Sequence, residues 1–333
     1  MNKCQLVRQT SEYVLKNAKH SQVNIQNLKQ LADDLLDQFQ KGYKYTEFEE
    51  YGCHYSNFNS PEQTIAYIFI LDTLNFCFWP CKEEFEYDDL ANGVKNLIFN
   101  HYEDVLPKNI ININEQFIKE QVFKNIDFPL IDERTRLLQE IGKITLNYFQ
   151  GEYINIIKEA NKSSVKLVDI LTSFFNNFQD IAIYQGHQIC FYKRAQILVA
   201  DLFGAFKGQS FGEFYDIDQL TTFPDYRVPQ ILNQFQVIQY SNELQNIIDN
   251  KTIIQHGSEY EVLLIILFIN IFIIWQKIEI RACTVYSVEE LKKYLKQKGK
   301  DLHSIEIDWI LWQKGEENRH NIKNHHRVLS IYY

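Results

Sequence analysis

Glycine and proline are scarce in this chain, and this scarcity limits the folds open to it. The 333 residues include 12 Gly and 6 Pro, whereas average usage would give about 40 of the two together. An all-β sandwich or barrel needs a turn about every 8–12 residues, and turns draw on these residue types. The hydrophobic fraction of 45% supplies material for a core. We therefore predict a mainly α-helical fold, with residues 1–333 forming one domain.

The charge balance and the cysteines narrow the class of protein. There are 34 basic and 43 acidic residues, a net charge of −9, which does not suit a protein that grips many phosphates of a nucleic acid. A small ligand with one phosphate needs only two or three local cations. The six cysteines form no C-x-x-C pair and the N-terminus lacks the pattern of a signal peptide. We expect reduced thiols in the cytoplasm or also the nucleus.

Apolar residues recur at helical spacing in several segments. In 23–41 they occupy one face of an amphipathic helix, and similar periodicity marks 134–149 and 166–175. Near the C-terminus, Ser287 and Glu290 match an S-x-x-E capping box, which predicts a helix that begins there and ends at Gly299.

Two further segments depart from the helical pattern. In 181–192, two apolar runs flank Gly186, which predicts a small β-hairpin. From Val262 to Trp275, fourteen residues include only Asn270 as a polar side chain. A bilayer span needs about 20 residues, so a buried helix or strand is favoured on length.

Generic catalytic motifs are absent, but polar residues lie among aromatic ones in several places. Cys77, Cys81 and His54 could contribute to a metal site, although buried structural cysteines are favoured because no fourth ligand is evident. Asp225 follows Pro224 in a loop that leads into a helix. A carboxylate there either caps the helix or points into a cleft, where lost hydration would tune it for acid–base chemistry.

Six long segments, taken together and in order, resemble the queuosine salvage protein family. The similarity extends from about Ser21 to Tyr333. It implies a predominantly helical fold similar to that of helical DNA glycosylases, and hydrolysis of the N-glycosidic bond of queuosine 5′-monophosphate to release queuine, without a metal or organic cofactor. The segments are DTLNFCFWP (72–80), FYKRAQILVADL (191–202), LTTFPDYRVPQIL (220–232), EIRACTVYSVEEL (279–291), IDWILWQ (307–313) and HHRVLSIYY (325–333).

The resemblance also implies roles for individual residues. Asp225, in FPDYR, matches the catalytic carboxylate. Such a group can stabilise an oxocarbenium-like sugar and orient the attacking water. The positions that bind the base in the family are matched by one imidazole, one carboxyl group and two aromatic rings. Gln313 stands where the family pattern leads us to expect an acidic residue, so an amide would replace a charge near the amine of queuine. The base-binding matches are His54, Phe223, Asp308 and Trp309.

The 5′-phosphate of the substrate requires a cation. Lys193 is the first candidate, followed by Arg194 and Arg227. For each of them the alternative is a surface salt bridge with an acidic neighbour.

Three other classes of function compete with this interpretation. The chain could bind and carry queuine or queuosine without cleaving it, could be a glycosylase of nucleic-acid polymers, or could be a helical scaffold. The acidic balance disfavours the polymer glycosylase. The catalytic match at Asp225 separates the hydrolase from the carrier, so an assay for free base would distinguish them. We expect a small-molecule substrate, and neither a nucleic-acid polymer nor a membrane as partner.

Against the family pattern, residues 262–278 look inserted. We interpret them as a lineage-specific insertion or a translated intron. If they belong to the protein, we expect a protruding or peripheral element.

Overall fold

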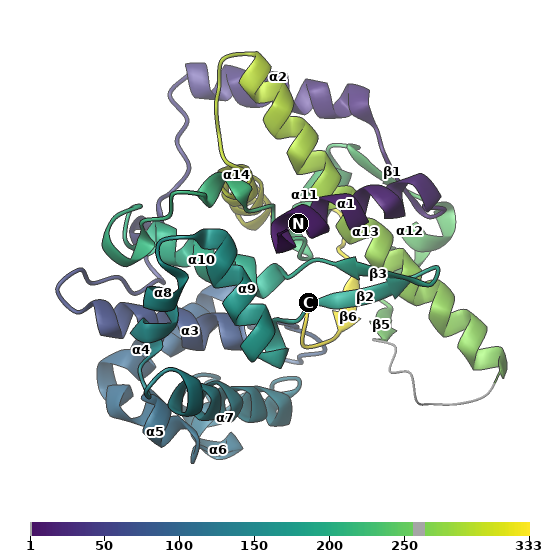
Figure 1. The fold of residues 1–333 in the computed structure, drawn as a ribbon. Helices are drawn as coiled ribbons and strands as arrows, with labels where there is room; N and C mark the ends of the chain where they lie inside the picture. Colours follow the sequence, from purple (N-terminus) through teal and green to yellow (C-terminus); the bar gives the residue numbers. More distant parts are fainter. Residues whose placement is uncertain (1, 256–263) are drawn as a thin grey trace.

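The structure is a computed structural model that describes residues 2–255 and 264–333, with side chains described outside 254–274. Figure 1 shows a molecule built mainly of helices, as the scarcity of glycine and proline predicts. The described residues form the helices α1 (Lys3–Asn17), α2 (Ile25–Gln40), α3 (Pro61–Leu74), α4 (Tyr87–Val105), α5 (Pro107–Ile110), α6 (Glu115–Gln121), α7 (Ile131–Tyr148), α8 (Tyr153–Ala160), α9 (Ser164–Phe174), α10 (Lys193–Ala205), α11 (Arg227–Gln234), α12 (Asn242–Asp249), α13 (Leu264–Gln297) and α14 (Ser304–Glu317).

Strands in the described part of the chain occur only as pairs. Two pairs are antiparallel and one, β5 with β6, is parallel. The predicted hairpin is confirmed: Gln185 and Gly186 have φ of 49° and 79°, the left-handed conformation that a two-residue hairpin turn requires. The strands are β1 (Ser21–Val23), β2 (Ile181–Tyr184), β3 (His187–Cys190), β4 (Ile238–Tyr240), β5 (Ile253–Gln255) and β6 (Arg327–Leu329).

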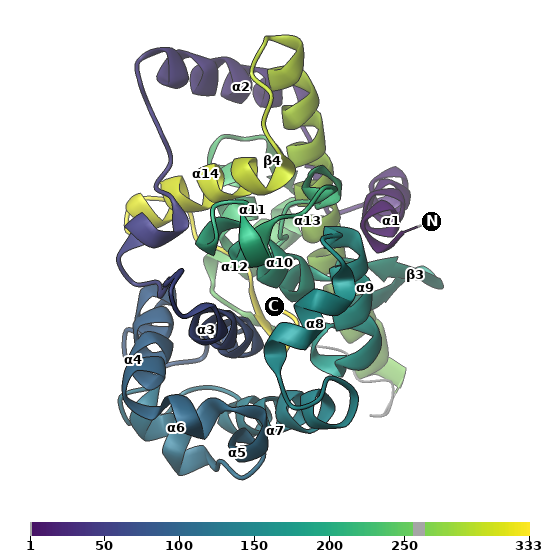
Figure 2. The ribbon, with the colours of Figure 1, turned by 60° about the vertical axis from the view of Figure 1, so that its left-hand side comes forward.

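Two clusters of buried apolar side chains organise the helices. The larger draws mainly on α1, α3, α4 and α7 to α10, and the smaller on α2, α11, α13 and α14. Figure 2 shows α3 to α7 gathered in the lower part of the view, with α2 and α14 in the upper part and α13 running from the lower right to the top. Helix α13 contributes to both clusters, with Ala282 in the larger and Cys283 in the smaller. Loops and helix ends from both groups meet around the pocket described below.

The predicted helices are present, but one predicted helix start is wrong. Asn24 caps α2, whose buried face is formed by residues of the predicted apolar stripe. Ser287 and Glu290 do not open a helix, because α13 runs without interruption from Leu264 to Gln297 and buries Ser287 completely. The capping motif is local, and the helix that starts at Leu264 already passes through it. The predicted end holds, since Gly299 has φ 89° just beyond α13.

The apolar run is described only in part. Residues 256–263 lie outside the described part of the chain, and so do the side chains up to 274. Gln276, Lys277 and Ile278, the last residues of the segment 262–278 that looks inserted, are buried at 0%, 4% and 1% exposure, so this end of the segment is interior and not peripheral as expected. In the part of the chain that the structure describes, no helix is long and apolar enough to cross a bilayer.

Candidate active site

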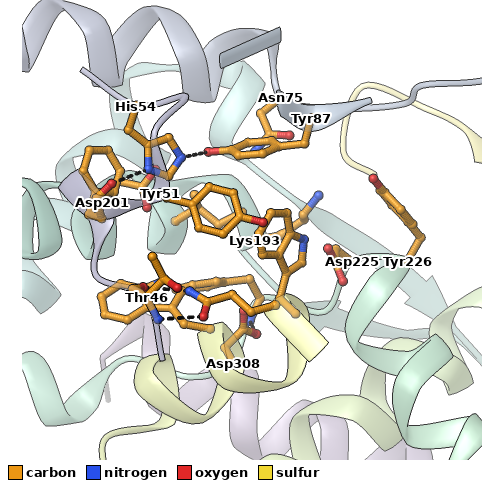
Figure 3. Close-up of a pocket in the computed structure, with 16 residues that line it drawn as sticks. Thr46, Tyr51, His54, Asn75, Tyr87, Lys193, Asp201, Asp225, Tyr226 and Asp308 are labelled. Atoms are coloured by element: carbon orange, nitrogen blue, oxygen red, sulfur yellow. Dashed lines mark hydrogen bonds between the residues drawn. The ribbon is translucent and has the colours of Figure 1, made fainter. Parts of the chain in front are cut away.

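A pocket opens where α10, α14 and the loop before α11 meet (Figure 3). It encloses about 780 Å³ including the open space at its mouth, a volume within the usual range for small-molecule sites. Seven of the eight predicted site residues line it, and Arg227 does not. The lining comprises Thr46, Phe48, Tyr51, His54, Asn75, Tyr87, Lys193, Ile197, Asp201, Phe223, Asp225, Tyr226, Asp308, Trp309, Trp312 and Gln313.

Asp225 both caps a helix and faces the pocket, so the two alternatives left open by the sequence coexist. Its Oδ1 accepts hydrogen bonds from the backbone N–H groups of Arg227 and Val228, each at 2.9 Å, at the start of α11. Among the described residues, no hydrogen bond engages its Oδ2. Burial raises the pKa of Asp225, while Lys193 and the two N–H groups oppose that rise. The backbone thus fixes Oδ1 of Asp225, while Oδ2 remains available to a ligand in the pocket.

A buried ion pair holds Asp225 and Lys193 in relation to each other. Arg281 forms a two-pronged contact with Asp180, in which Nη1 lies 2.8 Å from Oδ1 and Nη2 contacts Oδ2. The Nε of Arg281 donates to the carbonyl of Pro224 at 3.0 Å. Oδ2 of Asp180 accepts from the backbone N–H of Lys193 at 3.1 Å. The loop before Asp225 and the first residue of α10 are therefore anchored to the same pair.

Lys193 is buried, with 3% exposure, so a surface salt bridge is the wrong interpretation of it. Burial lowers its pKa to about 8, and the nearby Asp225 acts in the opposite direction. Within the described chain, no hydrogen bond engages its Nζ. An ammonium in this state, at the wall of a pocket, is available to an anionic ligand.

The two arginines ranked behind Lys193 are engaged elsewhere. The guanidinium of Arg194 donates to the backbone carbonyls of Asp72, Thr73 and Asn177. That of Arg227 forms an ion pair with Glu316 at 2.6 Å. Neither lines the pocket. Their predicted contact with the substrate phosphate therefore finds no support, because each guanidinium is held by other groups of the protein, Arg194 by backbone carbonyls and Arg227 by a carboxylate.

Asp308, which lies on α14, is close to the catalytic candidate Asp225. Its Oδ1 accepts hydrogen bonds from the hydroxyl of Thr222 and from the N–H of Phe223, the latter at 2.8 Å. Burial, followed by the charge of Asp225, raises the pKa of Asp308 well above its usual range. The ring of Phe223 and the indole of Trp309 also line the pocket. A protonated carboxyl group next to aromatic faces can hold a heterocyclic base by its edge and its face.

His54 is in the pocket wall, but both of its ring nitrogens have protein partners. Nδ1 donates to the carbonyl of Phe48 at 2.8 Å, so Nε2 accepts from the hydroxyl of Tyr87 at 2.9 Å. The ring stacks on Phe48 with 4.0 Å between centroids. Burial lowers its pKa to about 4. In this structure His54 therefore holds the hydroxyl of Tyr87, and its contact with a base stays a prediction.

Two hydrogen bonds of the Gln313 amide account for its departure from the family pattern. Its Oε1 accepts from the N–H of Thr46 at 2.9 Å, and its Nε2 donates to the carbonyl of the same residue at 2.8 Å. A carboxylate could accept the first bond but could not donate the second. The amide thus fixes the segment around Thr46 as a pocket wall.

Sequence reasoning missed several lining residues. On α10, Lys193, Ile197 and Asp201 recur every four residues, so helical spacing from Lys193 could have indicated Asp201. The same argument links Trp312 to Asp308 on α14. Asn75, Tyr51 and Tyr87 come from segments whose approach to the pocket has no such local signal.

Fold and site together define a mainly helical protein with a pocket lined by buried carboxyl groups and aromatic side chains. Comparison with known proteins gives the family. The family model described as "Queuosine salvage protein" matches residues 53–271 and 274–333. The chain belongs to this queuosine salvage protein family.

Several relatives carry the name "Queuosine 5'-phosphate N-glycosylase/hydrolase". The protein from Dictyostelium discoideum is 40% identical over 341 residues and covers 100% of both chains. The one from Sphaerobacter thermophilus is 34% identical over 281 residues and covers 82% of each. The one from Mus musculus is 27% identical over 351 residues and covers 98% of each.

Proposed function

We propose that this protein hydrolyses the N-glycosidic bond of queuosine 5′-phosphate and releases the base queuine. The names of its full-length relatives support this activity. The observation that carries it is Asp225, a buried carboxylate in the pocket with one oxygen fixed by two backbone N–H groups. A binding protein has no need for such a carboxylate, whereas N-glycoside cleavage does.

Asp225 acts at the sugar in the proposed reaction. As the glycosidic bond breaks, positive charge develops on the anomeric carbon and ring oxygen. The carboxylate stabilises this charge, orients a water molecule that attacks the anomeric carbon, and accepts the proton that this water loses. Lys193 nearby favours the ionised form of Asp225.

Asp308 acts at the departing base. A deazapurine is a poor leaving group as an anion, so it must receive a proton or strong hydrogen bonds. The raised pKa of Asp308 favours its protonated form, which can donate to the base. Phe223 and Trp309 stack on the faces of the base. Two carboxyl groups with different environments therefore take two different roles.

Lys193 binds the 5′-phosphate, because it is the cation that lines the described pocket. The six cysteines are free thiols in the structure, which supports a reducing compartment, the cytoplasm or also the nucleus. A small nucleotide is the expected partner, without a nucleic-acid polymer.

The deciding experiment is incubation of the purified protein with queuosine 5′-phosphate and, separately, with queuosine. Chromatography would detect free queuine and ribose 5-phosphate. We expect release of the base, faster from the phosphate. Tight binding of both compounds without release would refute the hydrolase and support a carrier.

A further inference from the structure

Two buried carboxyl groups at the far side of the pocket have oxygen atoms that lack a hydrogen-bond partner among the described residues. Asp72 on α3 and Asp201 on α10 are 0% and 6% exposed. Among the described residues, no hydrogen-bond partner is found for either side-chain oxygen of Asp72 or for the Oδ2 of Asp201. Asp201 lines the pocket, whereas Asp72 lies behind it. Leaving buried polar atoms unbonded costs stability, about 1–3 kcal/mol for each, so such atoms suggest a missing ligand.

The other carboxyl groups that line the pocket are already used. Asp225 accepts two backbone N–H groups, and Asp308 accepts a hydroxyl and an N–H. Asp201 has no comparable support. Burial raises the pKa of Asp201 to about 8, and burial with the proximity of Asp201 raises that of Asp72 well above its usual range. A cationic ligand beside the pair would oppose the effect of burial on both carboxyl groups.

Asp201 is well separated from the proposed reaction centre. It lies eight residues after Lys193 on the same helix, a rise of about 12 Å along the axis. Figure 3 shows Asp201 and Asp225 on opposite sides of the pocket. If the sugar lies at Asp225, a substituent that extends from the base is directed away from the sugar and toward Asp201.

The chemistry of the ligand indicates which group belongs there. The base of queuosine is a 7-deazaguanine with an aminomethyl arm that ends in a cyclopentenediol. The secondary amine in this arm is the positively charged group of the substrate. Gln313 cannot compensate that charge, because its amide is engaged with Thr46.

We infer that Asp201, supported by Asp72, binds the protonated secondary amine on the arm of the queuosine base. The inference rests on the proposed function for the orientation of the substrate. The contact makes Asp201 a determinant of specificity. A guanine or 7-deazaguanine nucleotide lacks the amine and would leave the buried carboxyl pair without a cation.

The test uses calorimetric binding of two ligands to the full chain. One is queuine, and the other is the same molecule with the arm NH replaced by an ether oxygen, which removes the charge and keeps the shape. Wild-type protein should bind queuine at least tenfold more tightly than the ether. Asp201→Asn should bind both equally. Asp127→Asn, on a side chain that is 93% exposed, serves as the matched control and should retain the wild-type preference.

Two results would overturn the inference: no preference for the amine in wild-type protein, or a preference that persists in Asp201→Asn. Should that variant fail to fold, the wild-type comparison decides alone. Hydrolysis of queuosine 5′-phosphate is measured separately. Wild-type protein that prefers the amine but releases no base would refute the hydrolase and leave the amine subsite in place.

Discussion

Two aspartates, one at each end of helix α10, are almost equally buried but differ in their partners. Asp180 contacts the N-terminal residue of α10 and is 4% exposed, while Asp201 lies two turns further along and is 6% exposed. Burial acts to raise the pKa of Asp180, but Arg281 overcomes it and the pKa is lowered. Burial raises the pKa of Asp201 to about 8. Burial alone therefore does not decide the charge of a carboxyl group; the neighbouring cation does.

Asp180 and Asp201 also differ in what they contribute to the pocket. At the Asp180 end, the pair with Arg281 supports the loop that carries Asp225 and the start of the helix that carries Lys193. At the Asp201 end, the carboxyl groups have no internal cation in the described residues that bonds to them. The first end is completed by the protein itself, and the second is completed by the ligand.

The largest expected effect is at the supported end, in Asp225→Asn. The amide oxygen can still accept the N–H groups of Arg227 and Val228, so the start of α11 is preserved. The negative charge at the sugar is lost, and we expect turnover to fall about 10³-fold, the scale seen when a preorganised electrostatic contact is removed. Release of queuine would be followed by chromatography, with circular dichroism to confirm the fold. Unchanged turnover in folded protein would refute the role of Asp225.

Breaking the ion pair should give the next largest effect. Asp180→Asn leaves the Arg281 guanidinium buried without its partner, and we expect the free energy of unfolding to fall by about 3–5 kcal/mol. The double variant Asp180→Leu/Arg281→Met removes both charges and should recover most of that stability.

Activity distinguishes positioning from simple stability in these variants. The double variant still lacks the contacts to Pro224 and to the N–H of Lys193, so kcat should stay about tenfold or more below wild type even where stability recovers. Denaturant unfolding and steady-state kinetics would measure both. Full recovery of kcat would show that the ion pair has a structural role only.

Lys193→Ala should weaken the preference for the phosphate about tenfold, because one charged hydrogen bond is lost. Its pKa of about 8 predicts a pH dependence. Below that value the ammonium is charged and kcat/KM favours queuosine 5′-phosphate over queuosine. As pH rises through about 8, the charge and the preference decline in wild type, whereas the variant shows no such decline. Equal effects of the substitution on both substrates would contradict the phosphate contact.

The smallest expected effect concerns Gln313→Glu. The carboxylate cannot donate to the carbonyl of Thr46, so a part-buried hydrogen bond is lost and stability should fall by about 0.5–1.5 kcal/mol at pH 8. Gln209→Glu, at an exposed position, is the matched control and should change stability little. Urea unfolding would compare the two. Equal stability of both variants would show that the Thr46 contacts do not matter.

Much of the fold could be predicted because its signals are local. Apolar spacing located α2, and Gly186 located the hairpin turn, since each depends on neighbours within a few residues. The capping motif at Ser287 failed for the same reason. A motif of four residues carries no information about the helix that already passes through it.

The sequence by itself determined the helical class, the family resemblance and the positions of Asp225, Lys193, Asp308 and Phe223 as site candidates. Only the tertiary structure decided their environments. It turned Arg227 toward Glu316, tied both nitrogens of His54 to the protein and brought Asp72 behind Asp201. The physical reason is that hydrogen bonding, burial and ionisation depend on which side chains meet across the fold. In this protein such partners come from separate segments of the chain, as Arg227 and Glu316 do, 89 residues apart.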